Sequence, residues 1–268
     1  FTAYPSNNGD LFGPHTYSHT GYTGTSIVID PDTDTSVILL INAVHPKDEH
    51  SVVRLRSLVA NAVAASIQPT PRTYTDHYYR RFLQFMDEPP VTPQDIVMLG
   101  NSLTERGFWS EYFQTERVLN RGIGGDCISG MIHRIGPIVE GQPRAIFIMG
   151  GANDLVFSKI SGEKLLEQYE RLLGIIARES PRTKIYIQSL LPLNEAMNEK
   201  FFKGKNARIA AFNALLRDMA ARRGLTYIDI WSDMQRDGIL PAEYTFDGIH
   251  LKADGYRIWI EKIRPYIK

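Results

Sequence analysis

The hydrophobic pattern of residues 94–268 alternates between short apolar runs and longer stretches with helical spacing. The apolar runs predict strands at 95–99, 117–120, 144–149, 184–188 and 226–230. The helical spacing predicts helices at 129–139, 164–178, 208–223 and 256–267. Strands that alternate with helices indicate a parallel sheet covered on both faces. We therefore expect an α/β fold whose ligands bind at the carboxyl ends of the strands.

Residues 1–67 follow a different pattern. Alternating positions at 21–30 and apolar positions at 37–42 predict a β-hairpin, and residues 51–67 have the spacing of a helix. A hairpin with one helix is too small to bury a good core by itself. We expect this segment to dock on the rest of the chain, on a second copy, or on a further domain.

Residues 68–93 are rich in proline, and helices and sheets tolerate proline poorly in their interiors. This segment predicts a linker or an arm that lies on a surface, with a short helix around residues 78–85. The expected organisation is therefore a hairpin and helix at 1–67, a linker or arm at 68–93, and the main α/β domain at 94–268.

Composition narrows the function classes. The chain has 268 residues, and its 30 basic and 30 acidic side chains cancel, so it has no electrostatic footprint for nucleic acid or for an anionic membrane surface. No apolar run approaches the length of a membrane-spanning helix. The one cysteine, Cys127, excludes an internal disulfide and a cysteine-rich metal site, and we expect it to serve packing. The chain begins at Phe1, so we interpret it as processed or shortened, with any targeting signal out of view.

Four polar or glycine-rich motifs follow the predicted strands or precede the last helix. They are Gly100-Asn-Ser-Leu103, Asn120-Arg-Gly-Ile-Gly-Gly-Asp126, Gly150-Gly-Ala-Asn-Asp154 and Asp247-Gly-Ile-His250. Each has an ordinary explanation by itself: a capping serine, turn glycines, a loop asparagine, an incidental histidine. The carboxyl ends of parallel strands converge, however, and together these motifs supply the nucleophile, base, orienting carboxylate and oxyanion donors of acyl transfer.

Metal and nucleotide sites receive little support. The glycine loop lacks the third glycine of GxGxxG, and no GxxxxGK[ST] is present. The other six histidines have no setting comparable to His250, and we interpret His15 and His19 as structural because no third ligand accompanies them.

The four motifs, in this order, resemble the SGNH hydrolases, also called GDSL-type esterases, over about residues 94–268. The resemblance implies a three-layer α/β/α, flavodoxin-like fold with a five-stranded parallel sheet. We expect Ser102 to be the nucleophile, His250 the base and Asp247 its orienting partner. The backbone N–H groups of Ser102 and Gly125 and the side-chain amide of Asn153 would form the oxyanion hole. No metal or organic cofactor is expected.

The resemblance implies short acyl esters as substrates, often acetyl groups on sugars, and favours a periplasmic or secreted location without settling the compartment. Polar and aromatic residues near the predicted cleft favour a carbohydrate ester, although core packing is the alternative for the aromatic ones. The expected substrate-binding residues are Asn101, Arg121, Asp126 and Trp109, and further residues near the cleft are Glu105, Arg106, Asn194, Phe108, Phe157 and Trp231. Asn101 replaces the aspartate of the family's name motif, and we expect it to tune the surroundings of the nucleophile.

Other functions remain open at this point. A lipase or lysophospholipase, a thioesterase and an acyltransferase would use the same triad. A binding module without catalysis would keep the fold, although none of the triad residues is lost. A dimer through the hairpin or the proline-rich arm also stays open.

Residues 1–67 resemble the carboxyl end of a class C β-lactamase-like serine esterase, with His19-Thr20-Gly21 in the place of that family's [KH]TG motif. The SxxK and YxN motifs of that family should lie upstream, and neither precedes this segment. Ser161-Gly-Glu-Lys164 matches SxxK by its letters but follows the HTG, and we interpret it as a helix start. The segment is therefore expected to be the tail of a second catalytic domain.

Overall fold

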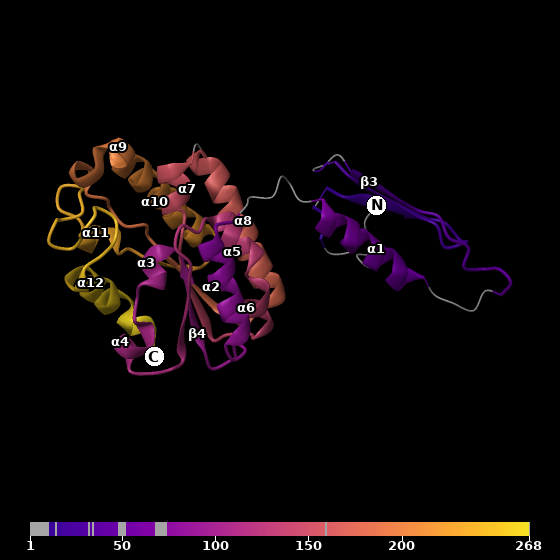
Figure 1. Ribbon diagram of the computed structural model, residues 1–268, viewed down its shortest axis with the longest axis horizontal. Coiled ribbons are helices and arrows are strands. Elements are labelled where there is room, and N and C mark those ends of the chain that lie inside the picture. The colour runs from indigo at the N-terminus through magenta and orange to yellow at the C-terminus, as the bar shows by residue number, and fades with distance from the viewer. Residues whose placement is uncertain are drawn as a thin grey trace. The chain divides into compact units, whose positions relative to one another are not determined.

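The computed structural model describes residues 11–13, 15–31, 33, 35–47, 52–67, 74–158 and 160–267. The chain divides into two compact units, Phe1–Thr73 and Tyr74–Lys268 (Figure 1). Each unit is described by itself below. Among the described residues, no helix is long and apolar enough to cross a membrane.

The second unit is built on a five-stranded parallel sheet, as predicted. Its strands are β4 (Ile96–Gly100), β5 (Val118–Gly122), β6 (Ala145–Met149), β7 (Lys184–Gln188) and β8 (Thr226–Ile228), in the order β5-β4-β6-β7-β8. Every residue of β4 and β6 is buried, which explains their unbroken apolar sequences: the central strands of a parallel sheet are covered on both faces. The register aligns the carboxyl ends of β4, β5 and β6, since Gly100 pairs with Gly122 on one side and with Met149 on the other.

Helices cover both faces of this sheet. Figure 1 shows α3, α4 and α12 on one side and α5, α6 and α8 on the other, which confirms the α/β architecture with helical layers. The helices and short 3-10 turns are α2 (Asp76–Asp87), α3 (Ser102–Glu105), α4 (Trp109–Phe113), α5 (Ile128–His133), α6 (Gly136–Glu140), α7 (Ala152–Phe157), α8 (Gly162–Glu179), η2 (Glu195–Asn198), α9 (Glu199–Phe202), α10 (Lys205–Arg222), α11 (Trp231–Met234), α12 (Ala253–Ile263) and η3 (Arg264–Tyr266).

The predicted single helix at 129–139 is wrong, because α5 and α6 are separate. The break falls at Arg134 and Ile135, just before Pro137 in the first turn of α6. Proline has no N–H to donate to the preceding turn, so it suits a helix start and interrupts a longer helix. The last strand is also shorter than the predicted 226–230, since β8 ends at Ile228.

The short helix expected in the proline-rich segment is present as α2, and it is longer than predicted at both ends. Helix α2 belongs to the second unit, and the side chain of Thr75 caps its start by accepting from the N–H of Tyr78 at 3.2 Å. The helix ends at Asp87, and Pro89 and Pro90, which follow its C-cap Glu88, cannot continue it. Tyr78 is buried, and its hydroxyl donates to the carbonyl of Gly130 at 3.0 Å, so α2 packs on α5.

Within the residues of the first unit that the structure describes, a three-stranded antiparallel sheet and one helix are present. Its elements are β1 (Tyr17–Thr20), β2 (Ser26–Asp30), β3 (Thr35–Leu39) and α1 (Val53–Ser66). The predicted hairpin corresponds to β2 and β3, whereas β1 was not predicted. Residues 21–25 were expected in a strand, but they form the turn between β1 and β2, closed by the N–H of Gly21 on the carbonyl of Thr25 at 2.8 Å. The interpretation of this unit as a β-lactamase-like tail stays a prediction.

Candidate active site

Ser102 is the first residue of α3 and is separated from the end of β4 only by Asn101. The turn requires glycine at position 100, because a Cβ there would lie 2.0 Å from Thr104 Oγ1 and 2.7 Å from the carbonyl oxygen of Met149. The side chain of Asn101 accepts from the N–H of Leu103 at 3.1 Å and is 2% exposed. Asn101 therefore shapes the turn that presents Ser102, and its expected contact with substrate is not supported.

The structure brings Ser102, His250 and Asp247 together although their sequence positions are far apart. His250 Nε2 lies 3.0 Å from Ser102 Oγ, and His250 Nδ1 lies 2.5 Å from Asp247 Oδ2. The other carboxylate oxygen of Asp247 accepts from the backbone N–H groups of Ile249 and His250 at 3.1 and 2.8 Å. Thr245 steadies this loop, since its hydroxyl donates to the carbonyl of His250 at 2.7 Å.

The surroundings keep Asp247 ionised. Burial raises the pKa of its carboxyl, but the hydrogen bonds from the side chain and backbone of His250 and from Ile249 outweigh burial, and the net pKa is lowered. A carboxylate at Nδ1 favours the imidazole tautomer that carries its proton there. His250 Nε2 is then the acceptor that faces the hydroxyl of Ser102.

Three donors lie at the neighbouring strand ends. Gly125 follows β5 with φ +77, a left-handed conformation suited to glycine, and nothing lies within 4 Å of the position of a Cβ there. In the part of the chain that the structure describes, no hydrogen bond from the N–H of Ser102 or Gly125 is present. The amide nitrogen of Asn153 donates to the carbonyl of Asp126 at 2.8 Å, which uses one of its two hydrogens and leaves the other for a ligand.

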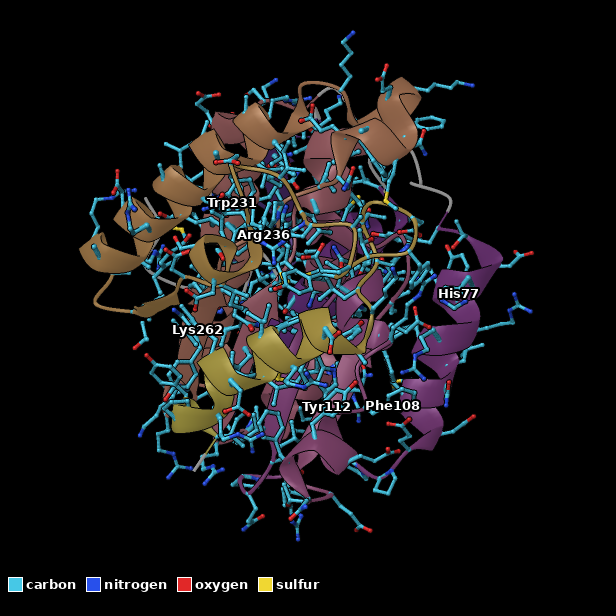
Figure 2. The ribbon with its side chains drawn as sticks, turned by 90° about the vertical axis from the view of Figure 1, so that its left-hand side faces the viewer. His77, Phe108, Tyr112, Trp231, Arg236 and Lys262 are labelled. Carbon is cyan, nitrogen blue, oxygen red and sulfur yellow. The ribbon has the colours of Figure 1, made fainter. Side chains whose placement is uncertain are left out.

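Ser102 opens into a cleft of about 910 Å³. The lining residues expected from the sequence are Glu105, Arg106 and Phe108, and the sequence pattern missed His77, Tyr112 and Phe246. Figure 2 labels His77, which lies on α2, Tyr112, which lies on α4, and Phe108, the residue just before α4. Phe246 adjoins Asp247, so its proximity to the motif was a usable signal. His77 carried none, because only the docking of α2 brings it to the cleft.

Trp109 and Asp126 are core residues, which corrects their expected contact with substrate. Trp109 is 1% exposed, donates from Nε1 to the carbonyl of Thr104 at 2.8 Å, and meets Trp259 edge to face at 4.9 Å. A ring so enclosed cannot stack on a sugar. Asp126 is 4% exposed and pairs with Arg134 Nε at 2.9 Å. Burial raises the pKa of Asp126 to about 6, against the lowering effect of Arg134.

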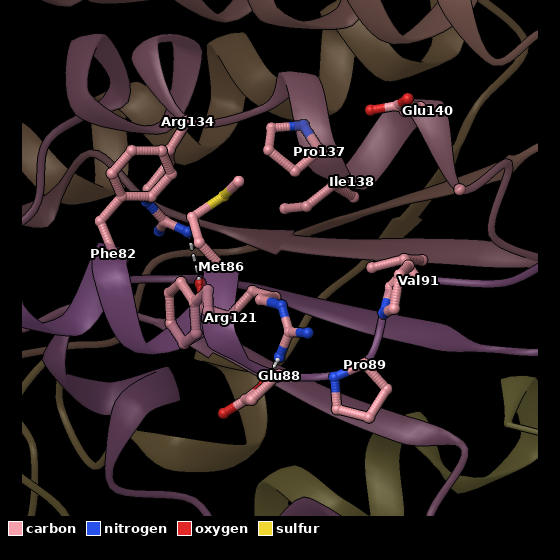
Figure 3. Close-up of a pocket in the computed structure, with 13 residues that line it drawn as sticks. Phe82, Met86, Glu88, Pro89, Val91, Arg121, Arg134, Pro137, Ile138 and Glu140 are labelled. Atoms are coloured by element: carbon pink, nitrogen blue, oxygen red, sulfur yellow. Dashed lines mark hydrogen bonds and ion pairs between the residues drawn. The ribbon is translucent and has the colours of Figure 1, made fainter.

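Arg121 points away from the cleft. Its guanidinium pairs with Glu88 at 2.7 Å and lines a separate pocket of about 310 Å³, which Figure 3 shows between the end of α2 and α6. Pro137 and Ile138 form the opposite wall, and Ser102 does not line this pocket. Burial lowers the pKa of Arg121, with Glu88 acting in the opposite direction. The expected substrate role of Arg121 is therefore corrected to a structural ion pair.

The remaining expected cleft residues lie elsewhere or support the site. Asn194 donates from its N–H to the carbonyl of Gly248 at 2.8 Å and so holds the loop that carries His250. Phe157 and Trp231 do not line the cleft. The described residues contain no group of three His, Cys, Asp or Glu side chains that could hold a metal ion.

The α/β fold brings residues of the four sequence motifs together at the carboxyl edge of its parallel sheet. Residues 98–258 match the family model of the GDSL-like Lipase/Acylhydrolase family. The chain belongs to this family of ester-hydrolysing enzymes, which confirms the resemblance of about residues 94–268 to the GDSL-type esterases.

Named relatives agree with the family. Platelet-activating factor acetylhydrolase IB subunit alpha2 of Homo sapiens is 27% identical over 201 residues, covering 72% of this chain and 82% of that protein. GDSL esterase/lipase WDL1 of Oryza sativa subsp. japonica is 27% identical over 204 residues, covering 65% of this chain and 77% of that protein. Among solved structures, a putative platelet activating factor from Streptococcus pneumonia is 24% identical and covers 72% of this chain and 93% of that chain, with a TM-score of 0.66. This last likeness shows the shared fold.

Proposed function

We propose that this chain is a serine esterase that hydrolyses short-chain acyl esters with Ser102 as nucleophile, His250 as general base and Asp247 as its orienting partner. The observation that carries the proposal is the continuous pair of contacts from Ser102 Oγ to His250 Nε2 at 3.0 Å and from His250 Nδ1 to Asp247 at 2.5 Å. A nucleophile held by a base that a carboxylate orients is the arrangement that acyl transfer requires.

In the first half-reaction, Ser102 Oγ attacks the ester carbonyl while His250 Nε2 takes the hydroxyl proton. The N–H groups of Ser102 and Gly125 and the amide of Asn153 stabilise the oxyanion. Collapse of the tetrahedral intermediate expels the alcohol, which receives the proton from His250. Asp247 stabilises the imidazolium that exists between these transfers. Water, activated by His250, then releases the acid and restores Ser102.

The acyl group is proposed to be acetyl, and the alcohol to be a carbohydrate hydroxyl. The names of the curated relatives include an acetylhydrolase at 27% identity, which supports the short acyl group. The cleft carries two largely exposed rings, Phe108 and Phe246, at 61% and 55% exposure, beside the polar side chains of His77 and Arg106. Aromatic faces and polar groups side by side suit a sugar ring and its hydroxyls.

An acetylated phospholipid is the second candidate. The platelet-activating factor acetylhydrolase relatives favour it by name, and the exposed cation of Arg106 in the cleft suits a phosphate.

The test is turnover of a nitrophenyl ester series, from acetyl to octanoyl, by the wild type and by Ser102→Ala. We expect a preference for acetyl and loss of at least about 1000-fold in the variant, since the nucleophile is removed. Acetylated xylo-oligosaccharides and an acetylated ether phospholipid, compared at equal concentration, then distinguish the two leaving groups. Ser102→Ala turnover equal to that of the wild type would refute the proposed nucleophile, and a preference for octanoyl would refute the short acyl group.

A further inference from the structure

Glu105 links helix α3, which begins with Ser102, to the loop at residues 123–126 that carries Gly125. We call this loop the oxyanion loop. Glu105 is the last residue of α3, three positions after Ser102, and its side chain is 20% exposed. Its Oε2 accepts the backbone N–H of Gly124 at 2.5 Å. Gly124 immediately precedes Gly125, whose N–H is a proposed oxyanion donor. The carboxylate of Glu105 therefore binds the loop one residue before that N–H group.

Two side chains of α2 hold that carboxylate in turn. His77 Nε2 lies 3.0 Å from both oxygens of Glu105, and Arg81 Nε lies 3.7 Å from Oε1. Both residues precede the segment 98–258 that matches the family model. Helix α2 therefore adds a second layer of contacts to a site whose proposed catalytic groups all lie within the matched segment.

Polar contacts hold the loop on both sides of Gly125. Gly125 itself is exposed, and apart from its chain neighbours no atom lies within 4 Å of where its Cβ would be. On one side, Asp126 is fixed by its ion pair with Arg134 at 2.9 Å. On the other side, Glu105 fixes Gly124. Together these two anchors define the direction of the N–H of Gly125.

We propose that Glu105 is a positioning residue for the oxyanion hole, and that His77 acts through Glu105 by holding its carboxylate. The inference rests on the proposed function, since it assumes that Gly125 serves the oxyanion. Donors help catalysis when they are fixed before the charge develops, so a loop freed at Gly124 stabilises the transition state less while it still binds substrate.

The experiment compares Glu105→Ala, Glu105→Gln and the control Glu167→Ala, an exposed glutamate on helix α8. We measure kcat and KM on nitrophenyl acetate, the rate at which a fluorophosphonate modifies Ser102, and Tm. Glu105→Ala is expected to lower kcat about 10- to 100-fold, less than the 100- to 1000-fold that loss of a donor itself costs. KM should stay within about threefold, and phosphonylation should slow in parallel, because the phosphoryl oxygen uses the same donors.

Glu105→Gln is the rescue variant, since its amide oxygen still accepts from Gly124. We expect its kcat within about fivefold of the wild type, and no change for Glu167→Ala. His77→Ala should lower kcat about 2- to 5-fold in the wild type and have no further effect in Glu105→Ala, as expected when one residue acts through another.

Several outcomes would overturn the inference. These are a kcat for Glu105→Ala within threefold of the wild type, equal losses in Glu105→Ala and Glu105→Gln, or a loss in His77→Ala that persists in the double variant. If Glu105→Ala fails to fold, the other two single variants decide by their own kcat: a loss above about fivefold in Glu105→Gln, or no loss in His77→Ala, overturns the inference. Failure of the proposed function is separate: it shows as wild-type turnover that does not depend on Ser102, whatever the result at Glu105.

Discussion

Removing the guanidinium of Arg134 tests how the oxyanion loop is built into the core. Its side chain is 1% exposed and donates to Asp126 Oδ2 at 2.9 Å, to the carbonyl of Arg121 at 2.9 Å and to the carbonyl of Gly100 at 3.0 Å. One residue thus ties the end of β4, the end of β5 and the glycine loop together. The proposed variant is Arg134→Met, which keeps an apolar chain of similar length.

One part of the expected loss in the free energy of unfolding depends on pH. In the wild type, burial raises the pKa of Asp126 from 3.8 to about 6, so the native state binds this proton more tightly than the unfolded chain. Stability from this group therefore falls as pH rises from about 4 to about 6 and is constant above. Without the lowering effect of Arg134 we expect the pKa of Asp126 to rise further. The carboxylate that is then buried without its partner costs about 2 kcal/mol more at pH 7.5, the order of magnitude that one to two pKa units represent, and this additional loss vanishes at pH 5, where the carboxyl is protonated in both proteins.

The second part is independent of pH. The carbonyls of Arg121 and Gly100 lose their guanidinium donor, although the carbonyl of Gly100 still accepts from the N–H of Ile123 at 3.2 Å. A buried polar group left without a partner costs about 1–3 kcal/mol. The free energy of unfolding should therefore fall by about 3–5 kcal/mol at pH 7.5 and by about 1–3 kcal/mol at pH 5, in line with the cost of breaking other buried ion pairs.

The assay is urea unfolding followed by tryptophan fluorescence at both pH values. All three tryptophans lie in the second unit, so the signal reports on the domain that contains Arg134. Asp126→Asn in the Arg134→Met background is the control, because it removes the uncompensated charge and should abolish the difference between the two pH values. A loss below about 1 kcal/mol at pH 7.5, or a loss of equal size at both pH values, would show that Arg134 does not stabilise the fold by compensating the buried charge of Asp126.

Three further variants test the site and its support. Asp247→Asn should lower kcat by about 10⁴-fold with little change in Tm, because the amide no longer favours the required tautomer of His250; a loss below tenfold on nitrophenyl acetate would contradict this role. Gly125→Ala should cost about 1–2 kcal/mol from its φ of +77, with room for the methyl group, and lower kcat about tenfold as the N–H turns; thermal melting and kinetics together check it. Trp109→Ala should destabilise the second unit by about 3–5 kcal/mol in urea unfolding, whereas a ring used for sugar binding would change KM and leave stability unaltered.

The local pattern of apolar and polar residues was sufficient to predict the parallel sheet and the order of the motifs along it. A central strand of a parallel sheet is buried on both faces, so Ile96–Gly100 and Ala145–Met149 had to be apolar throughout. The rule that ligands bind at the carboxyl ends of such strands then brought Ser102 and Asn153 to one edge. Helix boundaries were less certain, because the break between α5 and α6 depends on one proline within an otherwise continuous helical pattern.

In the first unit the sequence pattern did not predict strand β1. Strand β1 is only four residues long and partly exposed, so it has little apolar signal of its own. It forms because β2 supplies its hydrogen bonds, with Tyr17 paired to Ile29 and Thr20 to Ser26.

By itself, therefore, the sequence determined the fold class, the identity of the three proposed catalytic side chains and the edge of the sheet where they meet, because strand burial and motif order are local properties. The tertiary structure alone decided which neighbouring polar and aromatic residues face substrate. Arg121, Asp126 and Trp109 lie close to the motifs in sequence yet turn into ion pairs or core, whereas His77 reaches the cleft from a helix 25 positions before Ser102. The direction of a side chain depends on what packs against its element, and the residues that do so come from distant parts of the chain.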